Sequence, residues 1–195
     1  MITISKTRLL GYILYTFLAL FILKLLIPVG DHSFGMGKVV LLLLFGTIFT
    51  FLFLMSASKS IFRIIKKQGS SRWYTFVVFF VTLTIALITS ESDYGKFWTS
   101  VRLVGTTNYE QYSKNGELIL FNNGTFETRV IHVDFGEVYT GDYQISHDTV
   151  TLIRPNVITK TENTFCNRYV FDAARTTLLP LQSGFPEIQI QRQAK

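Results

Sequence analysis

The chain is 195 residues long and has a formal net charge of +6, although only 16% of its residues are charged. Hydrophobic residues make up 48% and aromatic residues 15%, and the mean hydropathy is +0.32. A soluble domain usually has about 25% charged residues, so this composition indicates a membrane protein. The single cysteine, Cys166, excludes an intramolecular disulfide framework and a cysteine-cluster zinc site.

The excess positive charge lies entirely in the first half of the chain. Residues 1–100 contain ten Lys or Arg and three Asp or Glu, a net charge of +7, whereas residues 101–195 have a net charge of −1. Basic residues beside apolar runs normally report membrane topology. A nucleic-acid-binding patch is instead expected on the soluble domain, so we expect no DNA or RNA polymer as a partner.

Three apolar runs follow one another before residue 95, each about 17–19 residues long and near the short end for a membrane-spanning helix. Lys24 lies near the end of the first run, where a lysine side chain can reach the interface. Residues 1–95 are therefore predicted to form a multi-pass transmembrane module, with the lipid bilayer as partner and the bacterial inner membrane as location. The predicted spans are Leu9–Ile27, Val39–Met55 and Trp73–Thr89.

The basic segment 59–72 has two interpretations. Lys59, Arg63, Lys66 and Lys67 recur at helical spacing, with apolar residues between them. This pattern resembles a short helix that rests on anionic headgroups. The alternative is an ordinary basic loop on the cytoplasmic side.

The third apolar run leaves the topology open, because its many Val, Thr, Ile and aromatic residues are also typical of a strand. With three spans, seven Lys or Arg flank the membrane on the side of the N-terminus and segment 59–72. Only Lys38, Lys96 and Arg102 lie on the other side, which predicts an extracytoplasmic C-terminal domain. If the third run does not cross, the N-terminus, the basic segment and the C-terminal domain all lie inside.

Residues 96–195 change to short alternating runs separated by turn signals. Asn123-Gly124 between two such runs is a strong hairpin signal. Eight or nine short strands at intervals of roughly ten residues predict a small antiparallel β-barrel, lipocalin-like in its hairpin pattern. The predicted strands are Val101–Val104, Glu117–Phe121, Phe126–Val133, Glu137–Ile145, Thr149–Arg154, Asn156–Lys160, Phe165–Phe171, Thr176–Leu179 and Glu187–Gln191.

The sequence contains no convincing catalytic or metal-binding pattern. Ser146-His147-Asp148 is contiguous and is typical of a turn, because neighbouring residues do not form a catalytic triad. His132 and Asp134 provide two potential metal ligands without an evident third. We therefore expect no enzyme activity, no catalytic residue, no metal and no cofactor.

Three residues are candidates for ligand binding if the barrel encloses a ligand. Arg154 shares a strand face with Val150 and Leu152, and the same alternation places Arg129 with Ile131, Val133 and Phe135 and Tyr143 with Tyr139 and Ile145. Inward-facing Arg and Tyr side chains suit an anionic, planar ligand. The alternative places both arginines on the solvent face in ion pairs.

Apolar runs followed by hairpin phrases at Asn123–Phe126 and Gly141–Leu152 resemble the membrane effectors of bacterial cyclic-oligonucleotide antiphage (CBASS) systems that have two spans and a small β-barrel. The resemblance implies that the barrel binds a cyclic dinucleotide in the cytosol. Binding would drive formation of a homo-oligomer whose membrane helices disrupt the inner membrane and kill the cell. This function requires that Trp73–Thr89 does not cross, or that the charge count misleads. The alternative is an extracytoplasmic lipocalin-like binding domain on a membrane anchor, acting as an accessory or immunity protein.

Overall fold

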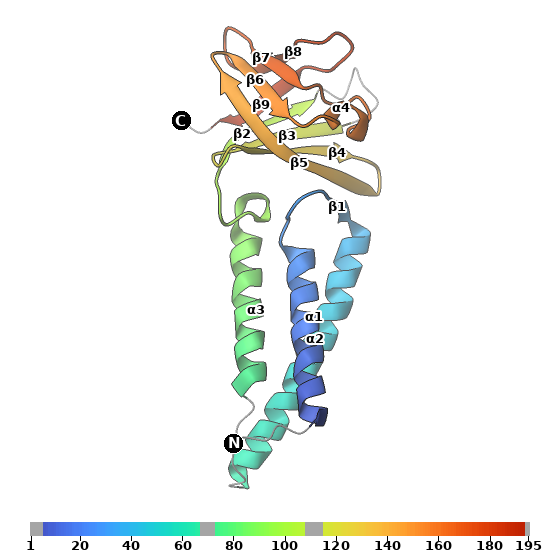
Figure 1. The fold of residues 1–195 in the computed structure, drawn as a ribbon, viewed down its shortest axis with the longest axis vertical. Coiled ribbons are helices and arrows are strands. Elements are labelled where there is room, and N and C mark those ends of the chain that lie inside the picture. Colours follow the sequence, from blue (N-terminus) through green and yellow to red (C-terminus); the bar gives the residue numbers. More distant parts are fainter. Residues whose placement is uncertain (1–5, 67–72, 108–114, 194–195) are drawn as a thin grey trace. The chain divides into compact units, whose positions relative to one another are not determined.

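A computed structural model describes residues 6–66, 73–107 and 115–193. The chain forms two compact units, one helical and one built around a β-barrel (Figure 1). The helical unit contains α1 (Lys6–Leu26), α2 (Met36–Ile65) and α3 (Trp73–Glu91), followed by the 3-10 turn η1 (Asp93–Gly95). The barrel unit begins at Lys96 and also includes segment 29–36, which the sequence alone assigns to the membrane module.

Each of the three apolar runs forms a helix long and apolar enough to cross a membrane. The third run is α3, so its strand-like composition does not produce a strand. In lipid every backbone polar group needs an internal partner, which a helix provides within one segment. The threonines also fit this setting, since Thr82 and Thr89 donate hydrogen bonds from their hydroxyls to the carbonyls of Val78 and Ile85, at 2.7 and 2.8 Å.

Aromatic side chains pack the interior of the helical unit. Phe53 of α2 stacks on Phe79 of α3 with ring centroids 3.8 Å apart, and Tyr15 of α1 stacks on Phe49 of α2 at 4.5 Å. Stacked aromatic pairs contribute about 0.5–1.5 kcal/mol beyond the area that they bury. A buried hydrogen bond of 2.8 Å between the hydroxyls of Ser56 and Thr75 also joins α2 to α3.

Helix α2 is 30 residues long, clearly longer than the apolar run predicted within it. Its last turns contain Lys59, Arg63 and the apolar residues between them. Residues 59–65 are therefore helical as a continuation of α2, so the alternative of a loop is wrong for them, and the contact with anionic headgroups stays a prediction. Lys67 and Arg72 lie outside the described residues.

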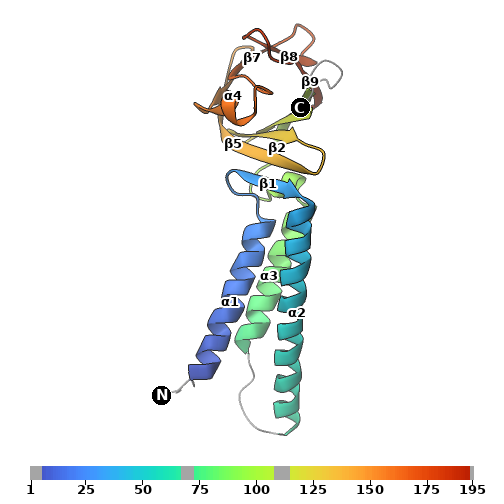
Figure 2. The same cartoon turned by 90° about the vertical axis from the view of Figure 1, so that its right-hand side faces the viewer.

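The predicted barrel is confirmed as a closed eight-stranded antiparallel barrel (Figure 2). Neighbouring strands follow the order β5-β4-β3-β2-β9-β8-β7-β6, and pairing of β6 with β5 closes it. The strands are β2 (Val101–Thr107), β3 (Asn115–Phe121), β4 (Thr125–Ile131), β5 (Phe135–Ser146), β6 (Thr149–Ile153), β7 (Arg168–Phe171), β8 (Thr177–Pro180) and β9 (Ile188–Gln193). Closure satisfies the edges that an open sheet would leave unpaired.

Local chemistry explains where the predicted hairpin between β3 and β4 turns. Gly124 has a φ of 85°, a left-handed conformation that favours glycine. The side-chain oxygen Oδ1 of Asn123 accepts hydrogen bonds from the backbone N–H and the hydroxyl of Thr125, at 3.2 and 2.8 Å. The Asn-Gly signal therefore located this turn correctly.

One predicted strand is wrong, because Val157–Lys160 forms the short helix α4. Its backbone hydrogen bonds form within the turn, and the N–H of Thr161 donates to the carbonyl of Val157 at 2.9 Å. The Thr161 hydroxyl also donates to that carbonyl and accepts from the N–H of Phe165. The turn buries Val157 completely against the barrel core, so tertiary burial overrides the strand propensity of its β-branched residues.

Large side chains fill the interior of the barrel. Phe126 and Phe165 are fully buried, as is Tyr169, whose hydroxyl accepts a 3.0 Å hydrogen bond from the N–H of Cys166. Burial raises the pKa of the Cys166 thiol. The described interior is thus a packed core in which Cys166 is a buried structural residue.

A ninth strand, β1 (His32–Gly35), joins the sheet from the short connection between α1 and α2. It pairs antiparallel with the first residues of β5, from His32 opposite Val138 to Gly35 opposite Phe135. Glycine and proline signals had predicted only a tight connection here. Phe34 packs over Gly136, where an added Cβ would lie 2.1 Å from Cζ of the phenyl ring.

We predict that Gly136→Ala destabilises the full-length protein in detergent by about 1–3 kcal/mol, because overpacking displaces the Phe34 ring. Thermal and denaturant unfolding measure the change. Gly46→Ala is the control, since a Cβ at Gly46 meets nothing within 4 Å. If the ring is the obstacle, the Gly136→Ala penalty falls in a Phe34→Ala background; an equal penalty in both backgrounds would contradict this account.

Candidate functional site

Arg129 lies on the outward-facing side of β4. Phe126 and Val130 belong to the barrel core, and Glu127 and Arg129 alternate with them on the opposite face. The guanidinium is held by the carboxylate of Glu127, with Nη2 3.0 Å from Oε2, and lies 3.7 Å from the carboxylate of Glu117. The face that Arg129 shares with Ile131 therefore points away from the core, which corrects the expected inward placement.

Arg154 lies directly beyond the end of β6. Val150 and Leu152 are buried in the core, as the shared face predicted. The guanidinium forms a bidentate pair with Asp31, both N···O distances being 2.7 Å, and also donates to the carbonyl of Thr140. Its Nε donates to the side chain of Asn156 at 2.8 Å.

Tyr143 lies inside the barrel, on the face predicted for it. Its ring is in the core, and its hydroxyl donates a 2.8 Å hydrogen bond to the carbonyl of Phe121. The three predicted ligand residues thus occupy the outward face, the β6 end and the interior, and the structure does not gather all three in one site. Their role in ligand binding stays a prediction.

Arg154, directly beyond the end of β6, has an aromatic neighbour. Its guanidinium lies 5.6 Å from the ring centroid of Tyr139, and Nζ of Lys160 lies 6.0 Å from the same centroid. The Tyr139 hydroxyl donates to Glu137 at 2.6 Å. Burial and this carboxylate raise the pKa of Tyr139 to about 12.

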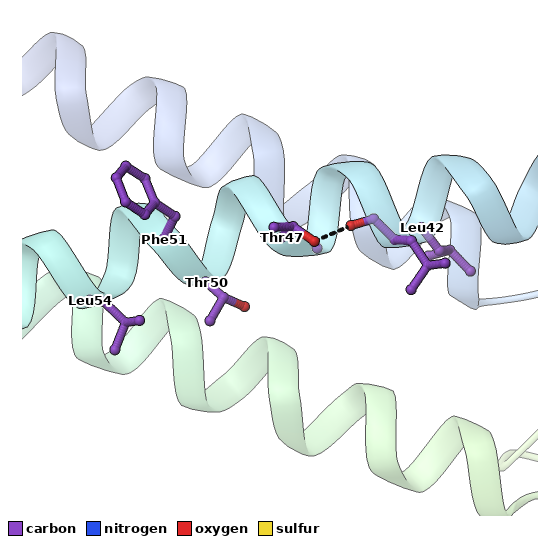
Figure 3. Close-up of a pocket in the computed structure, with 7 residues that line it drawn as sticks. Leu42, Thr47, Thr50, Phe51 and Leu54 are labelled. Atoms are coloured by element: carbon purple, nitrogen blue, oxygen red, sulfur yellow. Dashed lines mark hydrogen bonds between the residues drawn. The ribbon is translucent and has the colours of Figure 1, made fainter.

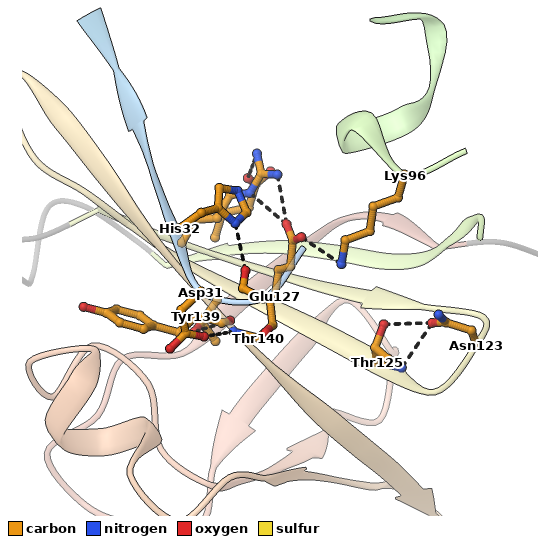
Figure 4. Close-up of polar contacts among 12 residues, drawn as sticks. Asp31, His32, Lys96, Asn123, Thr125, Glu127, Tyr139 and Thr140 are labelled. Atoms are coloured by element: carbon orange, nitrogen blue, oxygen red, sulfur yellow. Dashed lines mark hydrogen bonds and ion pairs between the residues drawn. The ribbon is translucent and has the colours of Figure 1, made fainter. Parts of the chain in front are cut away.

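The Asp31–Arg154 pair lies where the edge of β5 changes partner. Residues 142–146 of β5 pair with β6, and residues 135–138 pair with β1 on the same edge. Between these two ladders, Oδ1 of Asp31 accepts the N–H of Thr140 at 3.0 Å (Figure 4). The hydrogen bond from Arg154 is the main cause that lowers the pKa of the Asp31 carboxyl. The ion pair therefore joins the end of β6 to the start of β1.

Glu127 pairs with Lys96, the first barrel-unit residue after the helices, and with Arg129, which approaches β1. Its carboxylate is fully buried, with Oε1 2.8 Å from Nζ of Lys96, a lysine that is itself only 6% exposed. Lys96 follows η1 directly and lies 4.0 Å above the Phe121 ring. On the other side of the carboxylate, Arg129 lies 5.8 Å from the ring of Phe34 in β1. Figure 4 shows Lys96 and Glu127 pointing toward each other.

Six side chains hold segment 29–36 and the segment after η1, and we call this set the connector anchor. It fixes segment 29–36 and the segment that begins at Lys96 to one outer region of the barrel wall. The chemistry is structural, since each charged group faces an opposite charge within the barrel unit. The members are Asp31, Phe34, Lys96, Glu127, Arg129 and Arg154.

Sequence reasoning missed most of the connector anchor. Glu127 alternates with core residues, and a charged residue at that position usually faces solvent. Lys96 was considered only as one of the basic residues that flank the predicted spans. Asp31 follows Pro28 and Gly30, which indicate a turn without indicating a distant partner. Asp31 and Arg154 are 123 residues apart, so no local pattern links them.

Comparisons of the chain with protein-family models, with curated proteins and with solved structures found no match.

We predict that Glu127→Gln lowers the unfolding free energy of the full-length protein by about 3–5 kcal/mol, because it leaves the Lys96 cation buried without its counter-charge. Denaturant unfolding in detergent measures the loss. Asp148→Asn is the matched control, since its ion pair with Arg175 is exposed and should contribute less than about 1 kcal/mol. Equal effects of the two substitutions would contradict a special role for Glu127.

We predict that the stabilising effect of Asp31 depends on pH. Because its folded pKa lies below the ordinary value of 3.8, the stabilisation is complete above about pH 3.8 and is lost as pH falls through the folded pKa. The midpoint temperature of the wild type should exceed that of Asp31→Asn at pH 7, and the difference should shrink below pH 3.8. Arg154→Gln should abolish most of this difference; an unchanged difference in that background would refute the pairing.

Proposed function

We propose that the protein is an integral membrane protein whose barrel works on the extracytoplasmic side, as a binding or interaction domain on a three-helix anchor. The observation that carries the proposal is the pairing of β1 with β5. The lack of a catalytic pattern in the sequence fits a domain that acts by binding.

The pairing restricts how the chain can cross a membrane. If α1 and α2 both cross, segment 29–36 lies on one side and the residues after α2 lie on the other. Because β1 is hydrogen-bonded into the barrel sheet, the barrel must lie on the same side as segment 29–36. The chain must then cross once more between α2 and Lys96, and α3 has the length and composition to do so. This supports three spans over a two-helix hairpin.

The charge distribution supports an orientation for these three spans. With three spans, chain connectivity assigns Lys6, Arg8 and the five basic residues counted in segment 59–72 to the other side of the membrane from segment 29–36. Lys38, Lys96 and Arg102 lie on the barrel side. The excess of positive charge marks the cytoplasmic side, so the barrel is assigned to the opposite one.

The antiphage effector is the second candidate. One observation favours it: the ring of Tyr139 has two cations beside it, Arg154 and Lys160, as recognition of an anionic planar ligand would require. With three spans, however, a cytosolic barrel places the seven basic residues outside, against the charge rule. We therefore rank the effector below the extracytoplasmic domain.

Reporter fusions test the orientation in a bacterial host. We predict that alkaline phosphatase, which is active only in the periplasm, is active when fused after residue 195 and inactive when fused after residue 66. Fusions to green fluorescent protein at the same positions should show the reverse pattern. If the C-terminal fusion to green fluorescent protein is fluorescent and the C-terminal fusion to alkaline phosphatase is inactive, the extracytoplasmic assignment is overturned and the cytosolic effector is favoured.

A further inference from the structure

We infer that the C-terminal end of α2 is a binding site for anionic phospholipid headgroups. Helix α2 has 30 residues and so is about 45 Å long, whereas the hydrocarbon core of a bilayer is about 30 Å thick. About ten residues therefore exceed what a perpendicular span needs. The surplus includes the basic turns at the C-terminal end.

The middle of α2 shows what its membrane-embedded surface looks like. A shallow groove of about 490 Å³ runs along it, lined by α2 residues alone (Figure 3). The Thr47 hydroxyl donates to the carbonyl of Leu43 at 2.6 Å, which leaves an apolar surface suited to acyl chains. Its lining residues are Leu42, Leu43, Gly46, Thr47, Thr50, Phe51 and Leu54.

The end of α2 differs, because it has a basic side and an apolar side. Lys59 and Arg63 of α2 and Lys66, directly after it, follow at intervals of four and three residues. The N–H of Lys66 still donates to the carbonyl of Phe62 at 3.1 Å, so the three residues share one side of the helix end. Ile61 and Ile65, also four residues apart, lie on another side and are 57% and 73% exposed. Such large exposed apolar residues normally indicate a contact with membrane or protein.

The basic side of the C-terminal turns of α2 is accessible, although these turns belong to the helical unit. The same turns contact α3 through the buried Ser56, whose hydroxyl is hydrogen-bonded to that of Thr75, and Ser60 is buried as well. Lys59 and Lys66 are exposed, and Nζ of Lys66 lies 4.4 Å from the ring centroid of Phe62. The lysine stems can follow the apolar surface while their ammonium groups reach phosphates.

Charge complementarity decides the occupant. An apolar face at the depth where a spanning helix leaves the bilayer fits acyl chains, and three cations on the other side of the same turns fit the phosphates of an anionic leaflet. A second copy of the chain would bring the same three positive charges against them. An anionic lipid therefore fits this surface better than a second copy. The inference does not depend on the side on which the barrel lies.

Native mass spectrometry of the full-length protein in detergent tests the inference. Phosphatidylglycerol and phosphatidylcholine with identical acyl chains are supplied in equal amounts. We predict that the protein retains phosphatidylglycerol preferentially. In the triple variant Lys59→Gln, Arg63→Gln and Lys66→Gln, the preference should fall by about fivefold for each cation lost.

A barrel variant with the same change in net charge is the control: Arg168→Gln, Arg175→Gln and Arg192→Gln, all at exposed positions. It should keep the lipid preference, and thermal unfolding should verify that both triple variants are folded. Equal retention of the two lipids by the wild type, or an undiminished preference in the α2 variant, would refute the inference. A dimer that the α2 variant loses, without lipid preference, would overturn it in favour of a second copy.

Discussion

The ladder between β1 and β5 is the constraint on which the organisation of this chain depends. Four residues between two membrane-type helices are hydrogen-bonded into the edge of a barrel formed by residues more than sixty positions later in the chain. A hydrogen-bonded strand cannot lie on the other side of a membrane from its sheet. The short ladder therefore restricts how many times the chain can cross a membrane. The length and hydropathy of the third run alone do not decide that number.

Electrostatic pairing holds the segments beside this ladder. Glu127 is fully buried, a position that is strongly unfavourable for a carboxylate unless opposite charges and hydrogen bonds compensate it. Lys96 and Arg129 provide that compensation. Lys96 belongs to the segment after η1, and Arg129 approaches Phe34 of β1, so the two residues also link these segments through Glu127. At the β6 end, the Asp31–Arg154 pair has the same effect in a more exposed setting. The arginines that suggested a ligand are thus engaged with carboxylates of their own chain.

The helical unit follows the chemistry of a lipid environment. Aromatic stacking fills the spaces between helices, and short hydroxyl side chains hydrogen-bond either to their own helix or, in the case of Ser56 and Thr75, across two helices. The apolar surfaces face outward, as in a protein whose solvent is lipid. The end of α2 departs from this pattern, because there a basic side lies across the helix from exposed isoleucines.

The sequence alone determined the fold class, the existence of three apolar helices and most strands, because hydropathy and alternation are local properties of neighbouring residues. The Asn123-Gly124 turn was predictable for the same reason. Tertiary structure alone decided that Val157–Lys160 is a helix, that β1 exists, and that Arg129 faces outward. Those outcomes depend on burial and on partners far away in the chain: Val157 fills the core, β1 completes the free edge of β5, and Arg129 meets a carboxylate whose burial no local pattern signals.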